Sequence, residues 1–111
     1  MRYMFSTFNL RPEASIEDFG RALETFARHM RALDLIESTG ALTSRCDDSI
    51  LDTDERRQRF CFVTTFRDAD QSRRAIEHLT AQREQSHHAL HAMLADAVFS
   101  FWEDAPARCA Q

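Results

Sequence analysis

The 111-residue sequence has few of the residues that break or cross-link chains: two glycines, two prolines and three cysteines. So little glycine and proline, beside 43% hydrophobic residues, argues against a disordered or fibrous chain. Cys46, Cys61 and Cys109 are odd in number and show no C-x-x-C spacing, so neither a disulfide framework nor a zinc site is predicted. We expect reduced thiols and one domain, because a chain of this length can bury only one core.

Lysine is absent, and the fourteen basic residues are all arginines, scattered among eighteen acidic residues with a net charge of -4. Binding to a nucleic-acid backbone needs a concentrated basic surface. The densest cluster, Arg56, Arg57 and Arg59, follows a run of acidic residues, which is typical of a solvated loop. Nucleic acid is therefore not an expected partner.

Long hydrophobic runs and nucleotide or hydrolase motifs are also missing. No stretch approaches the roughly 18 apolar residues of a membrane-spanning helix, and residues 1–10 are too short and too polar for a signal peptide. We expect a cytoplasmic protein with no membrane partner. The sequence has no G-x-G-x-x-G, Walker or G-x-S-x-G pattern, so it gives no sign of nucleotide binding or hydrolysis.

The sequence does contain an alternation of strand-like and helix-like segments. Residues 2–10 are rich in aromatic and other strand-favouring types, which predicts a first strand. Ser15 then offers an N-cap, and apolar residues recur at steps of three and four over residues 16–33. This pattern predicts the first helix.

Two further strands are predicted in the middle of the chain. Residues 35–45 place apolar residues two apart around Gly40, which favours a strand with a bulge. Residues 58–66 alternate clearly and form the third strand. We expect these two strands to make a hairpin.

The last third of the chain returns to a helical pattern and ends in a strand. Asp68 offers an N-cap to a second helix that ends near Arg83. Residues 85–95 form a further helical stretch, and residues 97–102 form the last strand.

This order, βαββαβ, predicts an α+β fold of the ferredoxin-like kind, in which helices cover one face of a four-stranded antiparallel sheet. Residues 1–104 would form the single domain and residues 105–111 a flexible C-terminal tail.

Strand 58–66 is apolar on both sides, with Phe60, Phe62 and Phe66 on one face and Cys61 and Val63 on the other. The first and last strands repeat this two-sided pattern. Helices on one face leave the other uncovered, and a large exposed apolar face normally marks an interface. We therefore predict a homodimer joined through the sheet faces.

Several short segments resemble those of an uncharacterised bacterial family in the dimeric α/β-barrel superfamily. They are F-N-L-R-P at 8–12, His29, L-I-E at 35–37, L-T-S-R at 42–45 and F-W-E-D-A-P at 101–106. The resemblance implies two ferredoxin-like domains that close their sheets around a shared barrel.

The dimeric α/β-barrel superfamily includes cofactor-free monooxygenases, haem-degrading monooxygenases and purely oligomeric domains. The resemblance therefore implies a small-molecule-binding or cofactor-free monooxygenase-like protein, whose ligand would lie between sheet and helices. Two alternatives stay open: a non-catalytic dimerisation module, and a haem- or metal-binding protein. Fold alone does not choose among them.

The run Ser86-His87-His88-Ala89-Leu90-His91 is the feature that bears most on chemistry. His87 and His91 are one helical turn apart, a workable metal-ligand spacing when a further ligand comes from elsewhere. The alternatives are a polar helix surface and cavity-facing histidines that bind a ligand. Resemblance to the haem-degrading members would make His88 or His87 the iron ligand and Asn9 its amide partner, but their tryptophan is missing. We expect no cofactor and assign no metal site.

Three other residues are candidates with simpler alternatives. Asn9 binds a ligand or closes a turn through its own side chain. Arg45 binds an anionic ligand or pairs with Asp47 or Asp48. Trp102 lines a pocket or belongs to the core or dimer interface. No catalytic residue is assigned; the candidate ligand-binding residues are Asn9, Arg45, His87, His88, His91 and Trp102.

Overall fold

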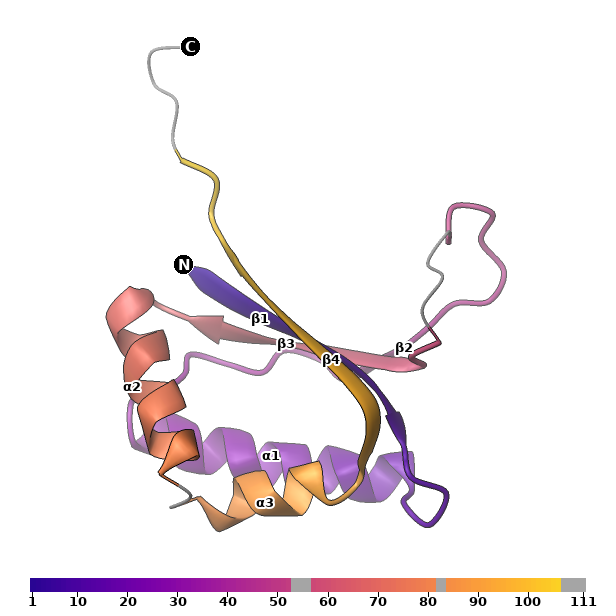
Figure 1. Ribbon diagram of the computed structural model, residues 1–111, viewed down its shortest axis with the longest axis horizontal. Helices are drawn as coiled ribbons and strands as arrows, with labels where there is room; N and C mark the ends of the chain where they lie inside the picture. The colour runs from indigo at the N-terminus through magenta and orange to yellow at the C-terminus, as the bar shows by residue number, and fades with distance from the viewer. Residues whose placement is uncertain (53–56, 82–83, 107–111) are drawn as a thin grey trace.

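The computed structural model describes residues 1–52, 57–81 and 84–106. Its strands form one four-stranded antiparallel sheet in the order β2-β3-β1-β4, and the three helices lie on one side of it (Figure 1). The α+β ferredoxin-like fold expected from the sequence is confirmed. Within the described residues no helix is both long and apolar enough to cross a membrane.

The central strand β1 (Arg2–Leu10) sets the two faces of the sheet. It pairs with β3 (Phe60–Phe66) on one side and with β4 (Leu94–Glu103) on the other, so that Ser6 lies opposite both Phe62 and Phe99. Residues opposite one another share a face, and alternate residues face opposite ways. These three side chains therefore all face the helices.

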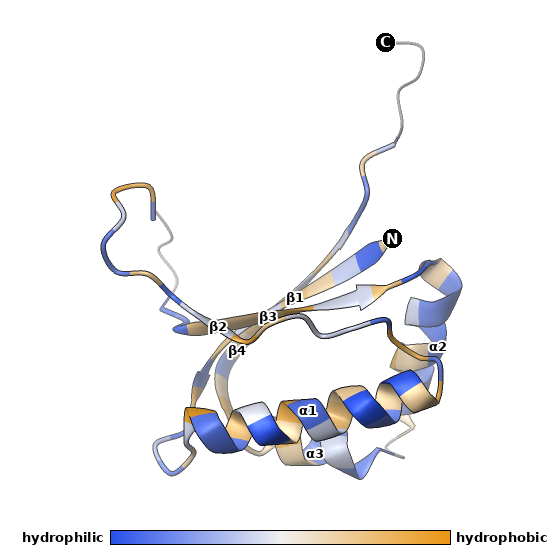
Figure 2. Ribbon diagram, turned by 180° about the vertical axis from the view of Figure 1, so that it is seen from behind, coloured by the Kyte–Doolittle hydropathy of each residue, from blue (hydrophilic) through white to orange (hydrophobic). Residues whose placement is uncertain are grey.

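Helix α1 (Ile16–Ala32) forms as its apolar spacing predicts. The Ser15 hydroxyl caps it by accepting a hydrogen bond from the backbone N–H of Asp18. Its buried side chains Phe19, Leu23, Phe26, Ala27 and Met30 follow helical spacing and pack on the sheet. The alternating hydropathy along α1 is visible in Figure 2.

Helix α2 (Ala69–Thr80) is capped by Asp68, as predicted, whereas α3 (Gln85–His91) ends before residue 95. Leu94 and Ala95 begin β4 instead, because Leu94 pairs with Leu10 across the sheet. The apolar spacing of residues 85–95 favours a helix, but backbone pairing with the end of β1 decides the conformation of Leu94 and Ala95. The predicted end of the second helix, at residues 82–83, lies outside the described residues. So do residues 107–111 of the predicted C-terminal tail, and Arg56 and Cys109.

Strand β2 (Thr43–Ser44) is much shorter than the predicted 35–45, although its antiparallel pairing with β3 is as expected. One isolated bridge, Ser38 to Thr65, precedes it. The next pairing joins Thr43 to Cys61. Between these two pairings the chain advances five residues, from Ser38 to Thr43, whereas β3 advances four, from Thr65 to Cys61. The offset of one residue falls where the bulge was expected, but residues 39–42 form no strand, and Gly40 has a left-handed backbone there with φ 64°.

Candidate functional site

A cavity of about 50 Å³ lies between the sheet and the helices. Its walls are mainly aromatic and aliphatic, from Phe8, Phe19, Phe26, Phe62 and Leu90 among others, and none of the described Asp, Glu or Arg side chains lines it. We call it the inner chamber. A neutral, apolar lining of this kind favours an uncharged ligand.

Two hydroxyl groups of the inner chamber have no hydrogen-bond partner. Ser6 on β1 is 1% exposed and Thr64 on β3 is 2% exposed, and the side-chain oxygen of each is buried and unpaired in the described structure. Because Met4 pairs with Thr64 while Ser6 pairs with Phe62, the two hydroxyls occupy diagonal positions on the same face. An unpaired buried hydroxyl costs about 1–3 kcal/mol, so native proteins rarely keep two together without a purpose.

His87 and His91 on α3 close the side of the inner chamber toward solvent. Their ring centroids are 4.3 Å apart, and His87 also lies 5.9 Å from the ring of Phe26 on α1. Burial lowers the pKa of His87 to about 4, with repulsion from His91 and His88 adding to the effect. Burial likewise lowers the pKa of His91, with a contribution from His88. His87 is therefore a neutral imidazole at pH 7, able both to donate and to accept a hydrogen bond.

A wider depression of about 660 Å³ lies on the outside of this pair, between the end of α2 and α3. Leu79, His87 and His91 line both the depression and the inner chamber. His88, by contrast, lines only the depression. The two spaces are thus separated by three shared side chains, those of Leu79, His87 and His91.

A buried carboxylate holds this part of the molecule together. Glu84 is 8% exposed, and its two oxygens lie 3.3 Å from His29 Nδ1 of α1 and 3.3 Å from His78 Nε2 of α2, while Ser86 Oγ donates to it at 2.6 Å. Burial opposes its ionisation, but the hydrogen bonds from Ser86, His78 and His29 outweigh burial and lower the pKa of Glu84. Glu84 therefore ties the start of α3, and with it His87, to the other two helices.

The geometry does not favour a metal at His87, His88 and His91, or at Glu84 with His29 and His78. Among the residues that the structure describes, no three His, Cys, Asp or Glu side chains are placed to hold a metal ion. Glu84 precedes the histidine run in the sequence, but the histidines that its carboxylate contacts are His29 and His78. Those partners come from elements that are distant in the sequence, so no local spacing signals them.

Asn9 lies away from the inner chamber. Its side chain joins two strand ends, because its amide nitrogen donates to Asp96 at 3.3 Å and its oxygen accepts from the backbone N–H of Arg59 at 2.9 Å. Asp96 has φ 53° at the point where the register of β4 shifts against β1. Asn9 thus stabilises a bulge, and its role in ligand binding stays a prediction.

Arg45 and Trp102 are also remote from the inner chamber. Arg45 pairs with Asp52 through bonds of 2.7 and 2.8 Å. A hydrogen bond from Arg59 lowers the pKa of Asp47, and the charge of Arg45 also helps to lower it. Trp102 is 60% exposed, and its indole N–H donates to Ser100 at 2.9 Å. Of the six sequence candidates, the structure brings only the three histidines together.

Sequence reasoning missed Ser6 and Thr64, although a signal for them exists. Each is a small polar residue on a strand face that is otherwise apolar: Met4 and Phe8 flank Ser6, and Phe62 and Phe66 flank Thr64. A polar residue at such a position is either a fault in the core or part of a site.

The fold and its interior cavity define a ferredoxin-like α+β protein with an uncharged chamber between sheet and helices. No known protein family matches the sequence, and no curated protein resembles it in sequence. Solved structures do resemble it: a protein from Arabidopsis thaliana superposes with a TM-score of 0.75 at 10% identity, covering 96% of this chain and 98% of that one.

Two bacterial structures are similar at lower scores. A dimeric ferredoxin-like protein of unknown function from Thermobifida fusca has a TM-score of 0.55 at 16% identity, with 91% of this chain and 88% of that one covered. A dimeric protein of unknown function with a ferredoxin-like fold from Bacteroides fragilis has a TM-score of 0.53 at 11% identity, with 93% and 95% covered. At these identities the similarity shows the fold alone.

Proposed function

We propose that this protein is a homodimer that binds a small, uncharged, mainly apolar molecule between its sheet and its helices. The observation that carries the binding proposal is the pair of unpaired hydroxyls, Ser6 and Thr64, within an aromatic chamber. A ligand with one hydroxyl or carbonyl group would satisfy both hydroxyls and contact the neutral His87. The apolar atoms next to this group would lie against the phenylalanines of the chamber.

Size sets a further limit on the ligand. A chamber of about 50 Å³ admits only the polar end of a molecule unless the wall moves. The larger part would lie across the wall formed by Leu79, His87 and His91, in the outer depression. A small phenol or an aliphatic alcohol has this shape and polarity.

Three probes of nearly equal size test the proposal: phenol, toluene and benzoate. We expect saturable shifts of the backbone amide signals of Leu90 and His91 in NMR titrations, with phenol binding tightest. Toluene should bind about tenfold more weakly, since it leaves the hydroxyls unpaired, and benzoate should not bind because its charge would be desolvated. Equal binding of benzoate and phenol, or no saturation with phenol, would refute the proposal.

Replacing the hydroxyls provides the matched variants. Thr64→Val removes one chamber hydroxyl with little change in volume, and the preference for phenol over toluene should shrink severalfold. Thr65→Val is the control, because Thr65 is the next residue on β3 and faces the other side of the sheet. The control should keep the full preference of the wild type.

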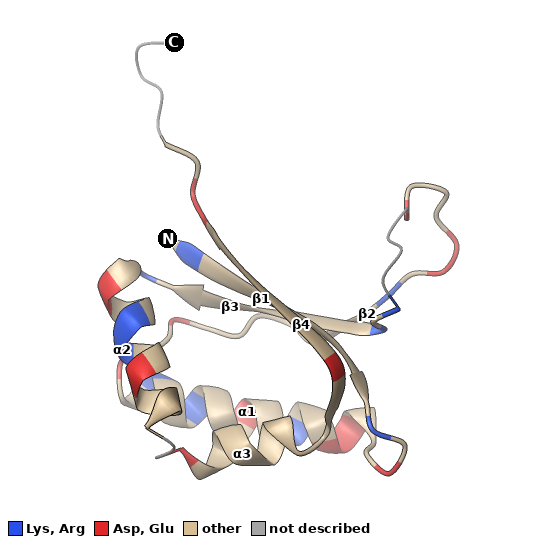
Figure 3. Ribbon diagram, viewed as in Figure 1, with Lys and Arg blue, Asp and Glu red and all other residues tan. Residues whose placement is uncertain are grey.

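The outer face of the sheet supports the homodimer. It carries Phe5, Val63, Val98 and Trp102, with Phe5 39% and Trp102 60% exposed. Phe5 and Trp102 meet edge to face at 6.3 Å and line a shallow hollow with Tyr3. Charged residues gather on the helices, loops and strand ends, while the middle of β1 and β3 carries none (Figure 3). An uncharged aromatic face of this kind favours a second copy of the same face.

Charge placed on this face should separate the protomers. The structure settles which side of β3 points away from the helices, since Phe62 and Phe66 are buried against them while Cys61 and Val63 face outward. We expect light scattering after size exclusion to give about twice the 12.9 kDa of one chain for the wild type and 12.9 kDa for Val63→Asp. Ile76→Asp, on the exposed face of α2, should remain dimeric. A monomeric wild type at micromolar concentration would refute the dimer without affecting the ligand proposal.

Two chemical alternatives use the same histidines. A cofactor-free oxygenation would use His87 as the base for a substrate hydroxyl. A pKa of about 4 makes His87 a weak base at neutral pH, which favours binding over turnover. Haem binding would need a space far larger than the inner chamber. Titration with haemin tests it, and a Soret shift that His88→Ala abolishes would favour haem over the proposed ligand.

A further inference from the structure

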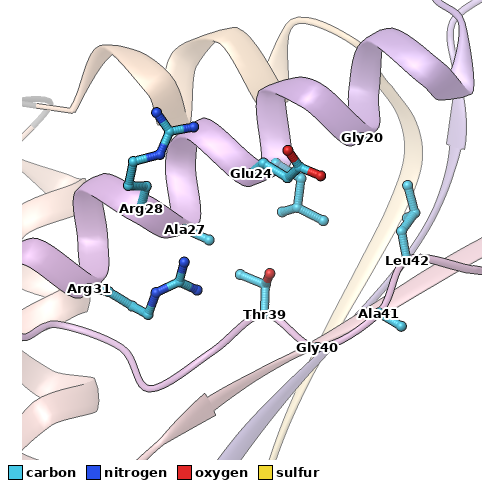
Figure 4. A pocket seen from close by; sticks show the side chains of 10 residues that line it. Gly20, Glu24, Ala27, Arg28, Arg31, Thr39, Gly40, Ala41 and Leu42 are labelled. Atoms are coloured by element: carbon cyan, nitrogen blue, oxygen red, sulfur yellow. The ribbon is translucent and has the colours of Figure 1, made fainter.

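Another hollow, of about 490 Å³, lies on the other side of α1 from the inner chamber, between this helix and residues 39–42 (Figure 4). We call it the α1 groove. It shares no lining residue with the inner chamber. Leu23, Ala27 and Leu42 provide apolar walls, and Gly20 lies close to Leu42, since a Cβ added there would be in contact with Leu42 at 3.9 Å.

Two arginines line the α1 groove without a carboxylate partner. Arg28 and Arg31 are three residues apart on α1 and so share one side of the helix. Within the described part of the chain, neither forms an ion pair. This contrasts with the arginines that do pair with acidic groups: Arg2, Arg21, Arg45, Arg59, Arg67, Arg73 and Arg74.

A polar group faces these arginines from the opposite wall. Thr39 is 6% exposed and lines the groove, and its hydroxyl forms no hydrogen bond within the described residues. The guanidinium of Arg31 reaches across toward Thr39, whereas that of Arg28 turns away from it (Figure 4). Arg31 and Thr39 thus form the polar end of the groove.

We propose that the α1 groove binds a small monocarboxylic acid, with Arg31 and Thr39 holding its carboxylate and Arg28 adding a second positive charge. A guanidinium matches a carboxylate with two parallel hydrogen bonds, and the hydroxyl of Thr39 adds a third donor. The alkyl chain of the acid lies on Leu23 and Leu42. This site is independent of the function proposed for the inner chamber.

On this proposal, Glu24 makes the α1 groove favour a ligand with one negative charge over a ligand with two. It lines the groove four residues before Arg28, between the arginines and Gly20 (Figure 4). A dicarboxylate whose first carboxylate sits on Arg31 would place its second near Glu24, and the two like charges would repel. A monocarboxylate with an apolar tail avoids this repulsion.

Arg31 also has a purely structural explanation. It lies in the last turn of α1, where a cation interacts favourably with the carbonyl end of the helix. On that explanation, replacing Arg31 would lower stability slightly and change no ligand response. The experiment must therefore measure binding and stability separately.

The test is an NMR titration with butyrate, succinate and inorganic phosphate at constant ionic strength. We expect butyrate to saturate and to shift the amide signals of Ala27, Thr39 and Gly40, with succinate and phosphate weaker. Arg31→Ala should weaken butyrate binding about tenfold or more, as expected for the loss of a charge-assisted pair, and Arg28→Ala severalfold. Glu24→Gln should strengthen succinate binding more than butyrate binding.

Arg21→Ala is the matched control, because it removes the same charge from the same helix but lies outside the groove. Its butyrate affinity should equal that of the wild type. Shifts that do not saturate, or an equal loss in Arg21→Ala and Arg31→Ala, would mean only general attraction of anions and would overturn the site. Lower stability of Arg31→Ala with unchanged butyrate affinity would assign Arg31 to the helix end alone.

Discussion

Replacing Thr64 by Val should stabilise the unliganded protein, which is an unusual expectation for a core substitution. Thr64 is 2% exposed, and its hydroxyl is buried without a hydrogen-bond partner among the described residues. Valine replaces that hydroxyl by a methyl group at nearly the same volume, so no cavity opens. An unpaired buried hydroxyl costs about 1–3 kcal/mol, and we expect about 1–2 kcal/mol of this to be recovered. For a domain of this size the gain corresponds to a rise in Tm of about 4–8 °C.

Urea unfolding of the wild type, Thr64→Val and Thr65→Val measures this directly. The protomer concentration must be held constant, because dimerisation makes apparent stability concentration-dependent. We expect a higher midpoint with an unchanged slope for Thr64→Val, and no gain for the control. Ser6→Ala should change stability in the same direction as Thr64→Val. A loss of about 1 kcal/mol or more in Thr64→Val would refute the reasoning, since it would mean that the hydroxyl has a partner such as a bound water.

Three further predictions concern His87, Glu84 and Gly40. His87 has a pKa of about 4 against 6.5 when unfolded, so the unfolded chain binds more protons between these values and stability should fall as the pH drops from 6.5 to 4. Urea unfolding at several pH values should show a smaller fall for His87→Phe; an equal fall would assign the dependence to other groups. Glu84→Gln should lose about 1–2 kcal/mol at pH 7 by weakening its bonds to His29 and His78, while the exposed Glu77→Gln should change little. Gly40→Ala should lose about 1 kcal/mol or more in the same assay, because φ is 64° there and a Cβ would lie 3.4 Å from the carbonyl oxygen of Val63; no loss would mean a different backbone conformation.

The elements with strong local signals were predictable from the sequence. The spacing of Phe19, Leu23 and Phe26 identifies α1 and its buried side without any other part of the chain. The alternation in β3 likewise identifies a strand with two apolar faces, and the order of elements then leads to the ferredoxin-like sheet. These features depend on residues close together in the sequence, where helical and strand periods act directly.

Other features were decided only when distant segments met. The end of α3 depends on Leu94 pairing with Leu10, and the short β2 depends on where residues 38–44 can reach β3. The spacing of the histidines was visible in the sequence, but only the packing of α3 on α1 and β4 places His87 against Phe26 and His91 against Phe99.

The sequence by itself therefore determined the kinds of elements, their order and the two-sided character of the strands. Tertiary structure decided which side of each strand meets the helices, and so which hydroxyls lie unpaired in the interior. It also gave Glu84 its partners and left Arg28 and Arg31 without an acidic partner among the described residues. The physical reason is that burial, hydrogen-bond pairing and charge pairing are properties of the surroundings of a residue, and those surroundings come from chain segments far away in the sequence.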